Sequence, residues 1–535
     1  MNKKIGPPQL FTKWFGWFCA DEYYEELQGD LEEAFYDNVE LYGLRKARQL
    51  YRLEVLKMLR PSVIKKLNGQ NYNSNNIDML SNYLKIAIRN MLGQKVYSFI
   101  NVFGLAVGMT ATILISLYVQ DELSYDKYHE KSDRIYRVSR EWLNQDGESS
   151  LHLGHVAAPF GPLLKNDFEG IVLNAVRMNS SGRPLVVHGD KRFEENNFFF
   201  ADADLFDVFS WKMLKGNRKT ALSEPNTIVL SASAAKRYFG DEDPMGQTVT
   251  YNDFGLSQEL KVTGVMEDTP HNSHFKMDMV ASFHMVEMFF GGRENLMKNW
   301  GGNNYSTFIV VPEGYNIADL EAQIPGFIDK HLGENMSGAM ASTTNRLHFM
   351  PLTDIHLHSH LDSEIEANGD IAYVYTYTII ALFILIIACI NFMNLSTARS
   401  VKRAREVGVR KVMGAYRSSL IRQFITESVL VAFISVLLSV LLVYFLLPGF
   451  NNFSGKELTL LGTDPMFLVG LLAAVVIVVG FVAGSYPAFY LSAYQPAVVL
   501  KGSNKANNQA FSLRSILVIF QFFISIWPSD RVVSF

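Results

Sequence analysis

The chain has 535 residues, of which 48% are hydrophobic and 19% charged, and its formal net charge is −4. This hydrophobic content is high for a soluble protein and low for one that lies wholly in a membrane, so we expect a few spanning helices joined to substantial aqueous domains. The balanced charge gives no indication of a nucleic acid or another acidic polymer as partner. The two cysteines, Cys19 and Cys389, exclude a disulfide framework.

Residues 1–68 are predicted to form a small helical domain in the cytoplasm. The N-terminus lacks the apolar core of a signal peptide, so the first long apolar run is expected to remain as an anchor. Leu27, Leu31 and Phe35 recur at a spacing of four, and Gly43 interrupts the helical pattern. Acidic residues dominate before this glycine and basic residues after it, which predicts an antiparallel pair of helices.

Residues 69–95 combine an Asn-rich linker with an amphipathic helix. Because a span follows directly, we expect this helix to lie in the membrane interface. A buried helix of a soluble domain is the alternative. The apolar stripe consists of Leu80, Leu84, Ala87, Ile88 and Met91.

Four apolar runs are long enough to cross a bilayer as helices. Basic residues precede the first run and acidic residues follow it, so the positive-inside rule places its start in the cytoplasm. The four runs cover residues 96–119, 372–395, 428–447 and 466–487. Small residues allow spanning helices to approach closely, and we expect such contacts at Gly104, Gly108, Gly480 and Gly484.

A fifth apolar run, at residues 516–526, is too short to cross a bilayer. The tail that follows it, residues 527–535, does not resemble the remainder of a spanning helix. We interpret this end as a partial fifth helix and an aberrant tail, from a truncated product or a shifted reading frame.

Residues 120–371 hold no spanning run, and acidic residues exceed basic ones there. We therefore expect an extracytoplasmic α+β domain that rests on the first two spans. Extended segments are predicted at residues 134–139, 227–230, 261–266, 307–311 and 346–352, and helices at residues 231–239 and 317–332.

Three histidines alternate near the end of this domain: His356, His358 and His360. On a strand they would share one face, where zinc or copper could bind. Asp354 and Asp362 mark the stretch as turn-like, so a structural or hydrogen-bonding role is the preferred interpretation. The domain has no HExxH motif, no metal-spaced cysteines and no recognisable Ser-His-Asp set, which favours a binding or mechanical role.

Residues 396–427 form a strongly basic segment between the second and third spans, and we place them in the cytoplasm. The helix formers in this segment predict a helix that is broken near Gly408 and closed at Gly414. Such a segment is either a topology signal on a solvated helix or a docking lever for a cytoplasmic partner. Glu427, at its end, is expected to reach the interface or pair with Arg422, with a proton relay as the alternative.

The segment REVGVRKVMGA, residues 405–415, resembles the signature loop of the MacB/FtsX family of ABC transporter permeases. The order of one span, a large outer domain and three further spans is similar too, as are NVFGLAVGM, YDKYHEKSDRIYRVSR, VTGVMEDTPHNSHF and GSYPAFYLSAYQP, so the resemblance extends over residues 80–526. PPQLFTKWFGWFCADEYYEELQGDLEEAFYD resembles the permease prefix domain of Bacteroidota-type permeases. Such permeases usually repeat the outer domain and membrane unit, whereas the second copy is missing here.

The resemblance implies a multi-pass permease of the bacterial cytoplasmic membrane whose basic loop seats on a separate ABC ATPase. The sequence has no GxxxxGK[ST] phosphate loop, so the partner would bind ATP, and we expect no cofactor, metal or catalytic residue in this chain. The implied coupling residues are Arg405, Glu406, Gly408, Val409, Arg410, Lys411, Val412, Met413, Gly414 and Ala415. The basic members would pair with acids of the ATPase, the apolar ones would fill its groove, and the glycines would permit a bend and close approach.

The implied function is mechanotransmission, in which ATP hydrolysis by the partner moves the outer domain for export or extraction of peptides, lipids or lipoproteins. Membrane lipid and a second permease copy, either a homodimer partner or the missing second half, are the other expected partners. The alternatives are a regulatory or signalling scaffold that controls an envelope enzyme, a sensor without an ATPase, and a nonfunctional truncated fragment.

Overall fold

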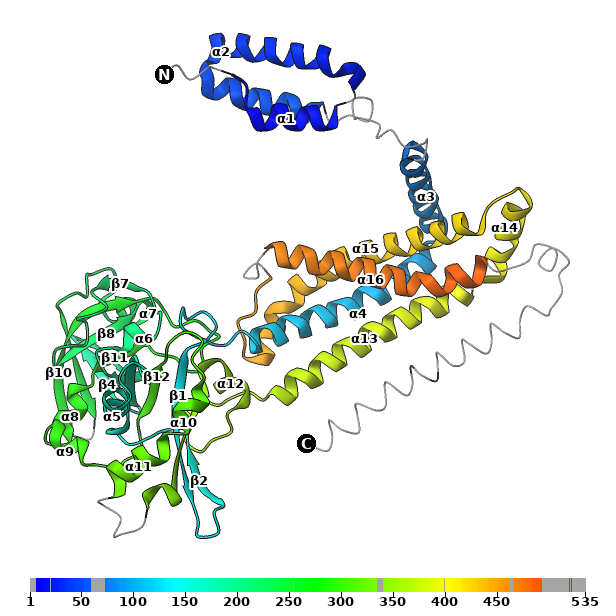
Figure 1. Cartoon of the computed structure of the whole chain (residues 1–535). Coiled ribbons are helices and arrows are strands. Elements are labelled where there is room, and N and C mark those ends of the chain that lie inside the picture. Colours follow the sequence, from blue (N-terminus) through cyan, green and yellow to red (C-terminus); the bar gives the residue numbers. More distant parts are fainter. Residues whose placement is uncertain are drawn as a thin grey trace. The chain divides into compact units, whose positions relative to one another are not determined.

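The computed structural model describes residues 6–19, 21–58, 73–253, 255–333, 340–398, 400–460, 465–492, 519 and 521. The chain divides into two compact units, residues 1–86 and 87–535 (Figure 1). The predicted aberrant tail at residues 527–535 lies outside the described residues, as does the partial fifth run apart from positions 519 and 521.

The first unit is a helical hairpin capped by a short helix. Gly43 has a φ of 78°, which takes it out of the helical region, and α2 doubles back there (Figure 1). Leu31 and Phe35 before the bend pack in one apolar core with Tyr51 after it and Phe15 of α1. The bend therefore falls at the glycine from which the sequence predicted it. The elements are α1 (Gln9–Phe18), α2 (Asp21–Lys57) and the start of α3 (Asn73–Gly93).

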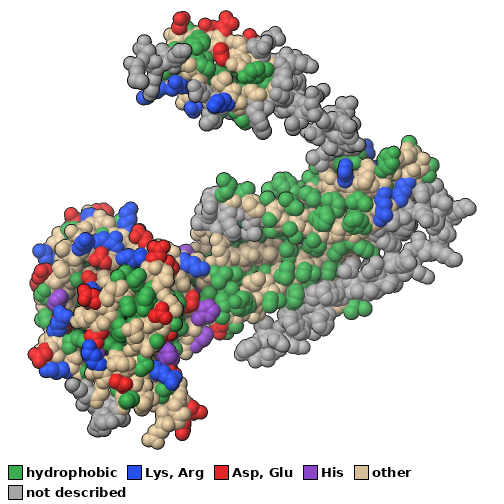
Figure 2. Space-filling view, viewed as in Figure 1, with side chains coloured by type: hydrophobic (Ala, Val, Ile, Leu, Met, Phe, Trp, Pro, Cys, Tyr) green, Lys and Arg blue, Asp and Glu red, His purple; other side chains and the backbone are tan. Residues whose placement is uncertain are grey.

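In the second unit, four of the described helices are long and apolar enough to cross a membrane. They pack side by side, and hydrophobic side chains cover the visible flank of their bundle (Figures 1 and 2). This surface is what helices that face lipid require. These helices are α4 (Lys95–Glu122), α13 (Ile371–Ala398), α15 (Arg417–Ser454) and α16 (Pro465–Ser492), and α14 (Ser400–Val412) joins the second to the third.

Two prolines lie inside spanning helices rather than at their ends. The third and fourth apolar runs were placed at residues 428–447 and 466–487, and the helices that contain them continue farther, α15 to Ser454 and α16 to Ser492. A spanning helix tolerates proline because neighbouring helices and local adjustments compensate for the lost backbone hydrogen bond. Gly455, with a φ of 68°, ends α15 instead.

The outer domain contains one mixed sheet, in which thirteen strands of the described chain take part. Its order is β13-β1-β12-β3-β6-β11-β8-β10-β9-β4-β5, with β2 beside β1 and β7 beside β10. The strands are β1 (Ile135–Leu143), β2 (Ser149–Leu153), β3 (Asn174–Ser180), β4 (Leu185–His188), β5 (Lys191–Glu194), β6 (Phe198–Ala201), β7 (Met213–Gly216), β8 (Thr227–Ser231), β9 (Thr248–Asp253), β10 (Leu256–Met266), β11 (Met279–Ser282), β12 (Ser306–Val310) and β13 (Asn345–Pro351). All five predicted extended segments fall on strands of this sheet.

Helices cover both faces of the sheet because its strands are apolar on both sides. In β8, Ile228 and Leu230 belong to one core, while Val229 between them belongs to another.

The chain enters the domain before β1 and leaves it after β13, and these two strands pair, with Val138 opposite Phe349. The helices are α5 (Phe160–Asp167), α6 (Leu205–Val208), α7 (Ala232–Phe239), α8 (His284–Phe289), α9 (Arg293–Met297), α10 (Ile317–Glu321), α11 (Ile324–Leu332), α12 (Ile355–His358), and the 3-10 turns η2 (Ala341–Thr343) and η3 (Leu352–Asp354).

One prediction and one alternative for local structure in this domain are wrong. The helix expected over 317–332 is divided into α10 and α11, and Pro325 stands in the first turn of the second helix, where it needs no backbone N–H. His356 and His358 lie in the helical turn α12, as the preferred turn-like interpretation of this stretch predicted. The alternative, three histidines on one strand face, is wrong, because alternation over five residues was too short to fix the backbone period. Among the described residues, no group of three or more histidine, cysteine or acidic side chains could hold a metal ion.

Candidate functional site

The basic segment between the second and third spans forms a helical elbow. Helix α14 runs through Gly408 to Val412, so the predicted break at Gly408 is wrong. A single glycine in a helix interior costs only about 1 kcal/mol, which the surrounding helix can absorb. Gly414, with a φ of 95°, turns the chain into α15, and the amide of Ala415 donates to the carbonyl of Arg410 at 3.0 Å. The closing turn is thus where the sequence placed it.

One side of the elbow is buried against the bundle and the other is exposed. Val407 packs with Leu420, Phe424 and Ala488 in a small apolar cluster that joins α14 to α15 and α16. The opposite side carries an apolar tip, which we define as Val409, Val412, Met413 and Tyr416, with exposures of 47%, 66%, 82% and 80%. Four large apolar side chains on an exposed basic loop mark an interaction surface more strongly than scattered ones do.

Two basic side chains of the elbow, Arg410 and Lys411, are held by the protein's own groups. The Arg410 guanidinium donates to Gln423 Oε1 at 2.6 Å and to Glu406 Oε1 at 2.7 Å. Lys411 Nζ donates to the carbonyl of Ser492 at 2.7 Å, at the end of α16. These contacts brace the elbow against α15 and α16. The side chain of Arg405, the remaining basic residue of the predicted coupling set, lies outside the part of the chain that the structure describes.

Gly108 lies at a close contact between the first and second spans. A Cβ built on Gly108 would stand 2.6 Å from Ala388 Cβ in α13, which is well inside van der Waals contact. A Cβ on Gly104 would stand 3.5 Å from Asn391 Nδ2, an ordinary contact. Of the two glycines on α4, only Gly108 stands where a methyl group would collide with the neighbouring helix.

The third and fourth spans make an equally close contact. A Cβ on Gly480 would stand 2.8 Å from the Cα of Val429, and one on Gly484 would stand 2.6 Å from Ser428 Cβ. Neither collision can be relieved by a side-chain rotation, because the opposing atoms belong to the α15 backbone or are fixed directly to it. The four helices are therefore joined in two close pairs, α4 with α13 and α15 with α16.

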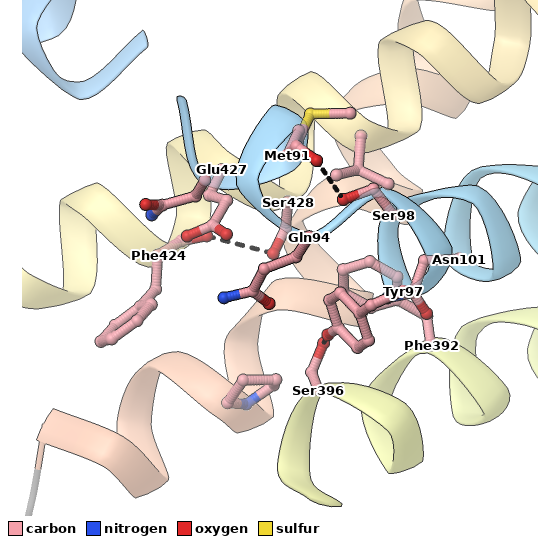
Figure 3. Close-up of a pocket in the computed structure, with 13 residues that line it drawn as sticks. Met91, Gln94, Tyr97, Ser98, Asn101, Phe392, Ser396, Phe424, Glu427 and Ser428 are labelled. Atoms are coloured by element: carbon pink, nitrogen blue, oxygen red, sulfur yellow. Dashed lines mark hydrogen bonds between the residues drawn. The ribbon is translucent and has the colours of Figure 1, made fainter. Parts of the chain in front are cut away.

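A small polar cavity lies where all four spanning helices approach the elbow (Figure 3). Its volume of about 30 Å³ suits one or two water molecules. Tyr97 OH and Ser396 Oγ are 3.0 Å apart across it and link α4 to α13. Asn101 Oδ1 is buried and has no hydrogen-bond partner among the described residues. A water molecule in the cavity would supply the missing hydrogen bond. Glu427 also lines the cavity. Polar residues inside or beside apolar runs are the sequence signal from which this cavity could have been located.

Comparisons with known proteins identify both parts of the second unit. Residues 98–327 match the MacB-like periplasmic core domain, and residues 378–496 match the FtsX-like permease C-terminal domain. A macrolide export ATP-binding/permease protein MacB from Aggregatibacter actinomycetemcomitans is 22% identical over 374 residues, which are 68% of this chain and 53% of that protein. The chain spans about half the length of the curated relatives it matches.

Solved structures that resemble part of the chain include a permease domain and a periplasmic region of MacB. A permease domain from Porphyromonas gingivalis is 22% identical, with a TM-score of 0.36, and covers 42% of this chain and 91% of its own. The periplasmic region of MacB from Actinobacillus actinomycetemcomitans is 18% identical, with a TM-score of 0.28, and covers 41% of this chain and 90% of its own.

The MacB-like periplasmic core domain and the FtsX-like permease domain follow each other in the chain in the order that the described fold also shows. The chain is therefore a MacB/FtsX-like ABC permease.

Proposed function

We propose that this chain is a permease subunit that couples ATP hydrolysis by a separate ABC ATPase to movement of its outer domain, for export or extraction of peptides, lipids or lipoproteins. The observation that carries the proposal is the apolar tip, exposed on an elbow that is otherwise braced against the bundle. The curated relative named above is an ATP-binding/permease protein, whereas this sequence has no GxxxxGK[ST] motif, so the nucleotide would be bound by a partner.

The first step is docking of the tip. Full burial of a methionine side chain contributes about 1.5–3 kcal/mol, so a groove that accepts Met413 and its neighbours would supply much of the affinity of a transient interface. The predicted pairing of Arg410 and Lys411 with acids of the ATPase remains a proposal. In the free chain both side chains hold the elbow in place, which assigns them a bracing role before the partner arrives.

The second step is transmission. A push on the elbow reaches α15 and α16 through the Val407 cluster and the Lys411 contact with Ser492. The outer domain lies between α4 and α13 in the sequence, so these two helices are its legs. Their close contact at Gly108 would make them move together.

The test compares two exposed apolar side chains at opposite ends of the bundle. M413D places a charge on the apolar tip, and F453D does the same at the outer end of α15, where Phe453 is 89% exposed. We expect M413D to weaken association with the ATPase by about 10-fold or more, the equivalent of one buried side chain, and to abolish stimulation of its activity. F453D should leave both unchanged.

Equal membrane insertion of the two variants, measured by membrane fractionation, controls for folding. Unchanged ATPase binding by M413D, or an equal loss in F453D, would refute docking through the tip. Transport of labelled peptides, lipids or lipoproteins in vesicles that contain both subunits would then identify the substrate class.

A further inference from the structure

Two buried carboxylates end the first span. Asp121 and Glu122 are the last residues of α4 before its cap, and their exposures are only 7% and 5%. Acidic groups are unfavourable at this end of a helix, where the macrodipole is negative, and burial makes the charge more costly still. The structure must therefore supply compensating groups, and they come from two distant parts of the chain.

The first compensating group is Lys456, in the outer loop between α15 and α16. Its Nζ lies 2.7 Å from Glu122 Oε1, 3.1 Å from Asp121 Oδ2 and 2.8 Å from Tyr125 OH. The contact to Asp121 is close enough for an ion pair but is not aligned as a hydrogen bond. Burial opposes the charge on this lysine, but hydrogen bonds and charges of Glu122 and Tyr125 prevail and raise the pKa of Lys456.

The second set of compensating groups comes from the outer domain. His271 Nε2 lies 2.7 Å from Asp121 Oδ1, and His356 Nε2 lies 2.8 Å from Glu122 Oε2. Because a carboxylate only accepts, each imidazole carries a hydrogen on Nε2. The His356 ring also stacks on Tyr125, with a centroid separation of 3.4 Å and an interplanar angle of 3°. We call Asp121, Glu122, Lys456, His271 and His356 the outer joint.

The outer joint closes a second connection between membrane helices and outer domain. Helices α4 and α13 lead into the domain through the backbone, but α15 and α16 do not. Lys456 attaches the loop between these two helices to the end of α4, and the histidines attach the same carboxylates to the domain. Gly369 allows the chain to leave the domain close beside them, because a Cβ there would stand 2.8 Å from Glu122 Oε2.

We propose that Lys456 is a positioning residue that ties the outer ends of α15 and α16 to the outer domain, so that motion of these two helices reaches the domain through the outer joint. This inference rests on the proposed function, since it concerns the route by which the elbow moves the domain. The elbow is braced against α15 and α16, and the outer joint lies at the far end of the same two helices. It thus completes a route from α15 and α16 to the domain through the last turn of α4.

The test follows an ATP-induced displacement in the full chain together with its ATPase in nanodiscs. One spin label at Phe453 and one at Met288, both exposed side chains, report the distance between the end of α15 and the outer domain. We expect K456M to reduce the ATP-induced change in that distance by about fivefold or more, while the affinity for the ATPase stays unchanged. K456R, which keeps the charge, should restore most of the change.

A second variant separates transmission from folding. K456M leaves two buried carboxylates short of a cation, which alone could destabilise the domain. The variant K456M/D121N/E122Q removes that imbalance, so we expect it to recover thermal stability but not the ATP-induced displacement. Displacement that is preserved in K456M, or regained in the neutral variant, would overturn the role of Lys456. A wild-type chain that shows no displacement with ATP would instead overturn the proposed function.

Discussion

The contact between α4 and α13 can be tested by moving one methyl group across it. In G108A the new Cβ would stand 2.6 Å from Ala388 Cβ, whereas carbon atoms pack at about 3.5–4.0 Å. The two helices must therefore separate by about 1 Å at this point. Neither methyl can rotate away, because both are fixed to helix backbones. Overpacking of this kind costs about 1–3 kcal/mol, so we expect G108A to destabilise the bundle by that amount.

The second substitution reverses the first. A388G removes the opposing methyl, so G108A/A388G carries the same atoms with the methyl on the other helix. We expect the double variant to return to within about 1 kcal/mol of the wild type, which is the scale of glycine propensity in a helix. Unfolding of the full chain in mixed micelles, followed by circular dichroism as denaturing detergent is added, would measure the free energies.

The control for G108A is G470A, on α16, where nothing lies within 4 Å of the added Cβ. This variant should be neutral. If G108A is also neutral, or if A388G adds to its effect instead of cancelling it, the α4–α13 contact is looser than the structure shows. Non-additivity of the two substitutions is the decisive quantity, because residues in direct contact couple and distant ones do not.

Three further predictions concern other contacts. G480A should destabilise the α15–α16 pair by about 1–3 kcal/mol and G470A should not, as the same detergent titration would show, because only the first Cβ meets a backbone atom, at 2.8 Å. E364Q should lower the free energy of unfolding of the outer domain in urea by about 3 kcal/mol, since Arg137 is buried and would lose its anionic partner; a loss well below 1 kcal/mol would contradict this. Burial lowers the pKa of His129 to about 4, so the unfolded state binds the proton more tightly and stability should fall as pH decreases from about 6.5 to 4, by about 3 kcal/mol in total. Urea unfolding at several pH values should show this slope, and H129Q should flatten it.

The membrane spans could be predicted from the sequence because composition alone decides whether a helix can lie in lipid. The ends of the helices could not be predicted in this way. The apolar runs stop at residues 447 and 487, yet α15 and α16 continue through Pro448 and Pro487. Gly408 favours a break, yet α14 continues through it, while Gly414 does turn the chain. A proline or glycine ends a helix only where the packing of the surrounding helices does not favour its continuation.

Contacts between distant residues carried no local signal. Strand β1 lies between β12 and β13 in the sheet, although most of the domain separates them in the sequence. Lys456 lies in the outer loop between α15 and α16, and nothing near it in the sequence indicates the carboxylates that it contacts. The available signal was the pair Asp121 and Glu122, which directly follows the first apolar run. In the sequence analysis these acids indicated only the orientation of that span in the membrane. Acids in that position need partners, and the fold supplies them.

The arrangement of close contacts determines how the elbow would act on the domain. Its two ends continue into α13 and α15, which belong to different close pairs, so displacement of the elbow would turn the α15–α16 pair against the α4–α13 pair. The two pairs also pack against each other toward their outer ends, where Ile113 and Leu117 of α4 share an apolar cluster with Val443 of α15. Lys456 adds a polar contact beyond this cluster, where it meets the last turn of α4. A relative rotation of the pairs would therefore displace the outer joint, and the domain that the histidines attach to it would be displaced as well.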